Sequence, residues 1–232
     1  MKRRSLIIIL CIAAVCILSA CNKKDEPKPV KPEKAYKDTL VDFGEILSAP
    51  DSEENMIDGM YGVREAIQAL GDAAADTVGY AYTDLNQDGQ KELLIGNFTG
   101  TGTVDTKNEI YGAYTYHMGF LEPLFEKQKR NTYALTDTGT LYFHGSDGVA
   151  YHIVAEYEMT EEGIVCKDFY FSYPKYGDIN DLEYFHNTTG EWDPDVSEKV
   201  DMTFEQLEQI RKELAARTVA LDAELLSGIG NE

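Results

Sequence analysis

Two hydrophobic periods follow one another along this chain. Near the amino end, apolar residues recur every three or four positions over residues 36–47 and again over residues 60–70, so each stretch would carry one apolar stripe as a helix. From residue 77 to 173 the chain instead has short segments rich in Val, Ile, Tyr, Phe and Thr, most of them separated by turn sequences such as NQDG, TDTG, GSDG and TEEG. This change predicts two helices followed by a meander of about six or seven antiparallel strands.

A helical period returns at the carboxyl end. Thr203 and Gln206 have the spacing of a capping box, apolar residues follow at helical positions as far as Leu225, and Gly228 can end the helix. The whole pattern predicts an α+β fold: a mainly antiparallel β-meander sheet with N-terminal helices and a C-terminal helix packed on it. Because no repeat unit recurs, a propeller or solenoid is disfavoured.

Residues 1–20 have the plan of a secretory signal, with three basic residues before a short apolar run from Ser5 to Leu18. The run ends in Leu18-Ser19-Ala20-Cys21, which resembles the lipobox of bacterial lipoproteins. This resemblance implies cleavage before Cys21 and a diacylglyceryl lipid on its thiol, which would anchor the protein to the cell membrane. An uncleaved anchor helix is the alternative, and either arrangement places the remaining chain on the extracytoplasmic face.

Residues 21–34 contain three prolines and no aromatic residue, which predicts an extended tether, and residues 35–232 then form a single domain. The signal and tether hold eight of the 21 basic and three of the 41 acidic residues, so the domain keeps 13 and 38 and a net charge of −25. Nucleic-acid binding is therefore disfavoured, and cation binding fits better. Cys166 is the one cysteine of this domain, so we expect no internal disulfide and a buried, unreactive thiol.

The sharpest chemical pattern lies between two predicted strands, in the stretch AYTDLNQDGQKELLIGN. Its five candidate cation ligands are Asp84, Asn86, Asp88, Gln90 through its backbone oxygen, and Glu92. Gly89 permits the sharp turn that such a loop needs. Because calcium takes six to eight hard oxygen ligands in irregular geometry, the stretch predicts a structural calcium site in a β-hairpin loop.

This spacing resembles the calcium loops of FG-GAP repeats, found in integrin propellers, with the pattern D-x-D/N-x-D-G-x-x-D. The resemblance implies the same five ligands, with Glu92 standing where that pattern has Asp. A helical EF-hand is disfavoured, because its twelfth position would be Ile95. The loop, with the later segments Tyr114 to Phe125 and Leu141 to Gly148, also resembles a group of uncharacterised lipoproteins from gut Firmicutes, which implies no known activity.

A metal-free Asp/Asn/Gly turn is the alternative reading of the loop. Three carboxylates in one loop would repel each other without a counter-charge, which favours the ion. Elsewhere, HGSDG at residues 144–148 holds the residue types of a hydrolase triad, but within one turn they cannot form the required line, so a hairpin turn is predicted. If Gly145 faces Gly148, His144 and His152 fall on opposite faces of the sheet, which argues against a joint metal site.

Aromatic residues mixed with carboxylates and amides between residues 168 and 195 form a second candidate site. A glycan or peptide groove there would use Tyr173, Tyr176, Asp178, Asp181 and Trp192. The alternative is that these aromatic side chains pack into the core. Asp178, Asn180 and Asp181 could form a second cation loop, although no glycine follows at the right place.

Two functions of different class remain open. The first is a surface-anchored lipoprotein with a calcium-stabilised domain that binds a glycan, a peptide or a partner protein. The second is a hydrolase of cell-envelope or extracellular polymers that uses paired carboxylates such as Asp178, Asp181 or Glu183. A cleft with two carboxylates 5–10 Å apart would favour the enzyme, and a shallow aromatic face would favour binding.

Overall fold

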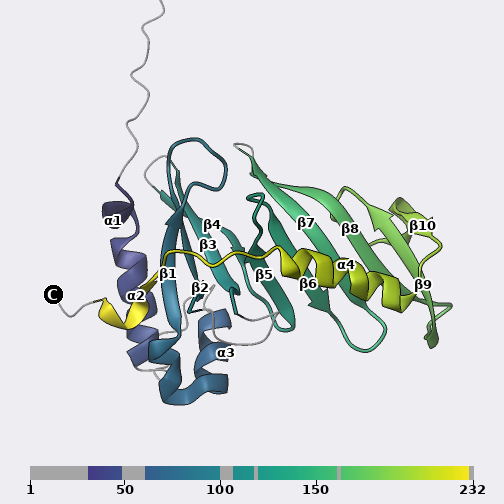
Figure 1. The fold of residues 1–232 in the computed structure, drawn as a ribbon, viewed down its shortest axis with the longest axis horizontal. Helices are drawn as coiled ribbons and strands as arrows, with labels where there is room; N and C mark the ends of the chain where they lie inside the picture. Colours follow the sequence, from purple (N-terminus) through teal and green to yellow (C-terminus); the bar gives the residue numbers. More distant parts are fainter. Residues whose placement is uncertain (1–30, 49–60, 100–106, 118–119, 161–162, 230–232) are drawn as a thin grey trace, which may run out of the picture.

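A continuous antiparallel sheet of eleven strands dominates the computed structural model, with helices packed against it (Figure 1). The structure describes residues 31–48, 61–99, 107–117, 120–160 and 163–229. The predicted signal, Cys21 and most of the predicted tether lie outside these residues. The α+β fold with a mainly antiparallel sheet is confirmed.

The strands follow the spatial order β10-β9-β8-β7-β6-β5-β3-β2-β1-β11, and β4 pairs with β3 beside this path. Their bounds are β1 Val78–Thr83, β2 Glu92–Asn97, β3 Ile110–His117, β4 Phe120–Glu126, β5 Asn131–Leu135, β6 Leu141–Ser146, β7 His152–Thr160, β8 Gly163–Lys175, β9 Asp178–Asn187, β10 Glu198–Val200 and β11 Glu224–Leu225. The predicted meander is thus confirmed, but it is longer than expected, because β4, β9, β10 and β11 were not anticipated.

The N-terminal helices pack on the β1–β3 end of the sheet. They are α1 Pro32–Ala35, α2 Lys37–Ser48 and α3 Tyr61–Leu70, followed by a 3-10 turn at Gly71–Asp76. Leu40, Phe43 and Ile46 of α2 are buried in one cluster with Val63 of α3 and with apolar residues of β1 and β2. The first predicted apolar stripe therefore faces the core. Of the second, Val63 and Ile67 pack on the core, whereas Leu70 at the end of α3 is 41 % exposed. Helix α1 also begins within the last residues of the predicted tether.

The C-terminal helix α4, Phe204–Ala216, begins at the predicted capping box, in which Thr203 accepts from Gln206 N. It ends earlier than predicted, and the chain then crosses the sheet in extended form, with Val219 N donating to Leu135 O. Strand β11 pairs with β1, and Leu226 is fully buried against α2 and β1. The helical period of this segment would favour a longer α4. Pairing with the open edge of β1 and burial of Leu226 in the apolar cluster under α2 instead favour an extended chain.

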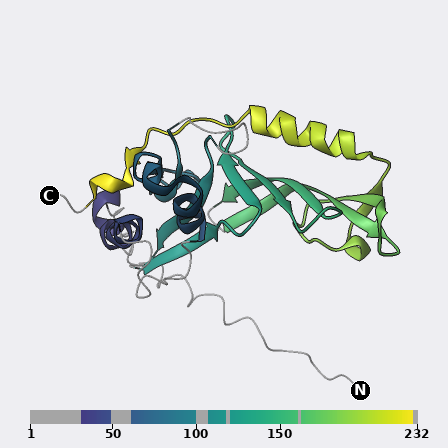
Figure 2. The same cartoon turned by 90° about the horizontal axis from the view of Figure 1, so that it is seen from below.

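Helix α4 lies along one face of β6 to β8, as the two views of the fold show (Figure 1, Figure 2). On that face Leu207 and Leu214 of α4 pack with Tyr142, Val154 and Tyr184 of the sheet. The opposite face carries a separate cluster of aromatic side chains from β6, β8 and β9, namely Phe143, Phe169, Phe171 and Phe185. Within the described part of the chain, no helix has both the length and the apolar composition needed to cross a membrane.

Candidate functional site

The predicted cation loop lies between paired strands, as expected. Thr83 at the end of β1 pairs with Glu92 at the start of β2, so residues 84–91 form the loop of a β-hairpin. Gly89 has a φ of +87° and Gln87 a φ of +62°, which shows that the chain turns through the left-handed region twice. The loop also contacts the N-terminal segment, because Tyr36, between α1 and α2, donates through Oη to Lys91 O at 2.9 Å.

The polar side chains of the loop fold inward onto its own backbone. Asp84 Oδ2 accepts from Gly89 N at 3.1 Å, and Asn86 Oδ1 accepts from Asp88 N at 3.2 Å. Asp88 accepts from Gln90 N through Oδ1 at 2.7 Å and from Asn86 Nδ2 through Oδ2 at 3.1 Å. The Gln90 side chain turns away and donates to Tyr116 O. These bonds curl the loop, and none of them uses the Gln90 carbonyl.

Glu92 is the most buried member of the set, with 1 % of its surface exposed. Leu85 N donates to its Oε2 at 2.8 Å, and Thr115 Oγ1 donates to its Oε1 at 3.3 Å. Burial raises the pKa of this carboxyl, and the charges of Asp88 and Asp84 raise it further. Glu92 therefore lies on the buried side of the loop. Keeping its carboxylate charged there costs electrostatic free energy, which a nearby cation would offset.

Asp84 has an unusual carboxylate. Its Oδ1 atom is buried and has no hydrogen-bond partner among the described residues. Asp84 also lines a cavity of about 100 Å³ beside the loop, together with Gln87, Thr140 and Glu158. A buried carboxylate oxygen without a donor costs free energy, so it needs a partner such as a cation or a bound water.

Across the described ranges, no group of three or more His, Cys, Asp or Glu side chains is gathered so that it could hold a metal ion. The carboxylates of Asp88 and Glu92 are instead engaged by the loop backbone. A bound calcium would therefore draw Asn86 and Asp88 away from part of their hydrogen bonds. The donor set, with carboxylate, amide and carbonyl oxygens, is of the hard type that calcium prefers.

The second candidate site is brought together only in part. Tyr173 and Trp192 both contact Tyr151, with ring centroids 5.4 and 5.5 Å apart and edge-to-face geometry. Both are more than a third exposed, so they form an aromatic surface rather than core. Tyr176 is fully exposed at the tip of the β8–β9 hairpin and does not join this group, although its ring lies 5.9 Å from Lys175 Nζ.

The acidic members of that site lie on the same exposed hairpin. Asp178 Oδ1 accepts from Asn180 N at 3.0 Å, and Asp181 lies 3.7 Å from Lys175 Nζ. Glu183 is bound to Lys199 at 2.6 Å. Each of these three carboxylates has its own partner, and none of them lines the cavity beside Asp84.

Two expectations about side chains in the sheet have different outcomes. His144 pairs with Val154 and Ser146 with His152, so the two histidines lie on the same face, under α4, and the predicted opposite placement is wrong. The hairpin loop is longer than the assumed two residues, because Ser146 pairs with His152 and residues 147–151 form the loop, and this changes the register. Burial raises the pKa of the partly buried Cys166 thiol to about 11, with a further contribution from Asp168, which agrees with an unreactive thiol.

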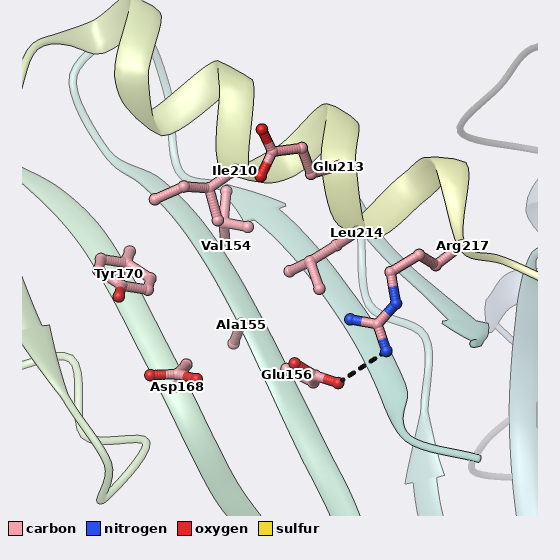
Figure 3. Close-up of a pocket in the computed structure, with 9 residues that line it drawn as sticks. All are labelled: Val154, Ala155, Glu156, Asp168, Tyr170, Ile210, Glu213, Leu214 and Arg217. Atoms are coloured by element: carbon pink, nitrogen blue, oxygen red, sulfur yellow. Dashed lines mark ion pairs between the residues drawn. The ribbon is translucent and has the colours of Figure 1, made fainter. Parts of the chain in front are cut away.

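A cavity of about 260 Å³ lies between α4 and the sheet and was not expected from the sequence (Figure 3). Its polar lining residues are Glu156 of β7, Asp168 and Tyr170 of β8, Glu213 of α4 and Arg217 at the end of α4. Some of these residues are far apart in the sequence: Glu156 and Arg217 are separated by 61 positions, yet a guanidinium nitrogen of Arg217 lies 3.6 Å from Glu156 Oε1. No local motif could have revealed them.

No protein-family model matches this chain, and no curated protein or solved structure matches it either. The resemblances of the lipobox and of the loop therefore stay predictions. Support for a function comes from the geometry of the described residues.

Proposed function

We propose that this protein is a lipid-anchored extracytoplasmic lipoprotein whose domain is stabilised by calcium in the β1–β2 loop. The observation that carries the calcium site is Asp84 Oδ1, a buried carboxylate oxygen without a hydrogen-bond partner in a loop that already curls around it. Turn chemistry accounts for the other bonds of the loop but gives this atom no partner. A cation beside Asp84 would supply one.

Calcium would be held by the side chains of Asp84, Asn86, Asp88 and Glu92 and by the backbone oxygen of Gln90. The ion would supply positive charge to three carboxylates, of which Glu92 is almost fully buried. Its role is structural, because it joins the ends of two neighbouring core strands. Extracellular calcium suffices for a site of about 10⁻⁴–10⁻³ M affinity.

Removing calcium should lower the melting temperature of the protein by about 3–6 °C if the ion contributes about 1–2 kcal/mol. Asp88→Ala should lower it similarly and abolish the response to calcium, because no neighbour replaces its carboxylate. The measurement is thermal unfolding of wild type and variant in millimolar calcium and in chelator, with calorimetric titration of calcium into the chelated protein.

Asp178→Ala is the matched control. It removes one carboxylate and the same type of hydrogen bond, from the backbone N two residues ahead, as Asp88→Ala does. It should leave the calcium response intact. Equal melting in calcium and chelator, with no heat of binding at millimolar calcium, would show the loop to be a metal-free turn.

For the domain itself, we propose a binding module for a glycan, a peptide or a partner protein. The contact of the half-buried Tyr151 with the exposed rings of Tyr173 and Trp192 supports this function, because exposed aromatic side chains suit such ligands. The hydrolase alternative at Asp178, Asp181 and Glu183 has less support, because these acids are engaged on an exposed hairpin.

Anchoring at Cys21 has its own test. Mass spectrometry of membrane-bound protein should find a diacylglyceryl mass on an N-terminal Cys21. Cys21→Ala should leave the chain unprocessed, because the thiol that accepts the lipid is absent. An intact Met1 on mature wild-type protein would contradict the lipid anchor.

A further inference from the structure

The cavity beneath α4 combines an apolar wall with an unusual pair of carboxylates (Figure 3). Val154 of β7 and Ile210 and Leu214 of α4 supply the apolar side. Glu156 and Asp168 face each other across β7 and β8, on the face that α4 covers. The cavity therefore lies on the opposite face of the sheet from Tyr173, because side chains alternate along β8.

The register that creates this pair is not the one that charge would favour. Counting back from the turn at Thr160 and Gly163, an unbroken ladder would place Lys167 opposite Glu156, as an opposite-charge pair. The ladder instead shifts between Glu156 and Tyr157, so that Asp168 takes this place. Directly opposed side chains have Cβ atoms about 4.5–5.5 Å apart, and like charges there are destabilising. Bulges often re-aim side chains at functional sites, which accounts for a register that charge disfavours.

Each carboxylate of the pair is held through one oxygen only. Glu156 Oε1 accepts from Thr140 Oγ1 at 2.5 Å and lies 3.6 Å from Arg217. Asp168 Oδ1 lies 3.0 Å from Nε2 of His186, whose ring stacks on Tyr170. Glu156 Oε2 and Asp168 Oδ2 have no hydrogen-bond or ion-pair partner among the residues that the structure describes. The side chain of Glu156 is only 13 % exposed, so water reaches its carboxylate poorly.

We propose that this cavity binds a primary ammonium group on an alkyl stem, as in a lysine side chain or a free alkylamine. The ammonium group would donate to Asp168 and Glu156. Glu213 adds a third negative charge at the α4 side, and Arg217 beside Glu156 adds one positive charge, so the lining stays net negative. The methylene stem would pack on Ile210 and Leu214. A bare divalent cation fits less well, because two free carboxylate oxygens fall short of the six to eight that calcium takes.

The inference goes beyond the proposed function and does not depend on it, because it concerns other residues on another part of the sheet. The strongly acidic domain would attract cations generally, so any test must separate the cavity from net charge. Asp181→Asn serves as the matched control, since it removes the same charge from an exposed position on the neighbouring hairpin.

The full-length chain is titrated with n-butylammonium and with Nα-acetyl-lysine methylamide, each against a neutral isostere, n-butanol and Nα-acetyl-norleucine methylamide. Binding is followed by NMR shifts of the Ile210 and Leu214 methyl groups. The ammonium probes should bind at least about tenfold more tightly than their isosteres, because one charge-assisted hydrogen bond accounts for that factor. Tighter binding of the lysine derivative points to a peptide source, and tighter binding of butylammonium to a free amine.

Asp168→Asn should weaken binding of both ammonium probes by about tenfold, and Asp181→Asn should leave it unchanged. The side chain of Asp168 is about half exposed, so the isosteric variant should keep the wild-type melting temperature, which confirms that it is folded. The inference would be overturned if ammonium and neutral probes bound equally tightly, or if both variants lost the same affinity. It would also be overturned if the probes left the methyl signals of Ile210 and Leu214 unshifted.

Discussion

Replacing Lys127 by Met should lower the free energy of unfolding by about 3–5 kcal/mol. Lys127 Nζ lies 2.6 Å from Glu65 of α3 and 2.7 Å from Glu109, and the side chains of Lys127 and Glu109 are 10 % and 5 % exposed. Its Nζ also lies 5.5 Å above the Tyr111 ring. Met retains much of the stem but not the charge, so the substitution leaves Glu109 buried without its cation.

Chemical denaturation of wild type and variant measures this loss. Lys199→Met is the matched control, because Lys199 Nζ lies at the same 2.6 Å from Glu183 but its side chain is 59 % exposed. Its loss should change stability little, since solvent screens an exposed pair. Similar losses of unfolding free energy for both substitutions would mean that burial does not determine how much the Lys127 ion pairs stabilise the fold.

The pH dependence of the Lys127→Met variant follows from Glu109. Burial raises the pKa of this carboxyl above its ordinary value of 4.5, and Lys127 opposes the rise. A carboxyl with a raised pKa binds its proton more tightly when folded, so stability falls as pH rises from the unfolded to the folded pKa. Without Lys127 that window widens upward, and acidification from neutral pH towards 4.5 should restore part of the lost stability. Adding Glu109→Gln should remove this recovery.

Much of the fold could be predicted because its signals are local. Strands β1, β2, β3, β5, β6, β7 and β8 coincide with stretches rich in β-branched and aromatic residues between turn sequences. Strand β4 was missed because it contains Pro123, and proline usually argues against a strand. It is tolerated here because β4 pairs with β3 alone, so that one of its edges is unpaired. Strand β9 was also missed, because its first half is acidic and exposed and so lacks the strand pattern.

The candidate sites divide along the same line. The β1–β2 hairpin loop could be predicted because its turn residues and candidate cation ligands are neighbours in sequence. The cavity could not, because its register depends on a shift between Glu156 and Tyr157 and its far wall on where α4 crosses the sheet. The ion pairs of Lys127, which directly follows β4, join it to Glu65 of α3 and to Glu109, which directly precedes β3. No spacing rule anticipates such contacts, because tertiary packing alone creates them.

Helix α4 provides the second large expected effect. Leu207→Ala should lower the free energy of unfolding by about 2–5 kcal/mol, because it leaves a hole in a close-packed cluster. Leu207 is fully buried against Tyr142, Val154 and Tyr184. Ala favours a helix at least as well as Leu, so the loss reports packing and not helix propensity. Denaturant unfolding measures it, with Leu70→Ala as the control, since Leu70 is also helical but 41 % exposed.

The same substitution should also loosen α4 selectively, because Leu207 is the buried apolar residue near the start of the helix, while Leu214 and Ala215 are buried near its end. Hydrogen exchange of α4 amides should accelerate more than that of β7 and β8 amides, whose ladder stays intact. The cavity has Ile210 and Leu214 as one wall, so a loosened helix would widen it and weaken binding of an alkylammonium probe. Uniform acceleration across helix and sheet would instead mean that α4 unfolds only with the whole domain, and the cavity would then keep its shape until global unfolding.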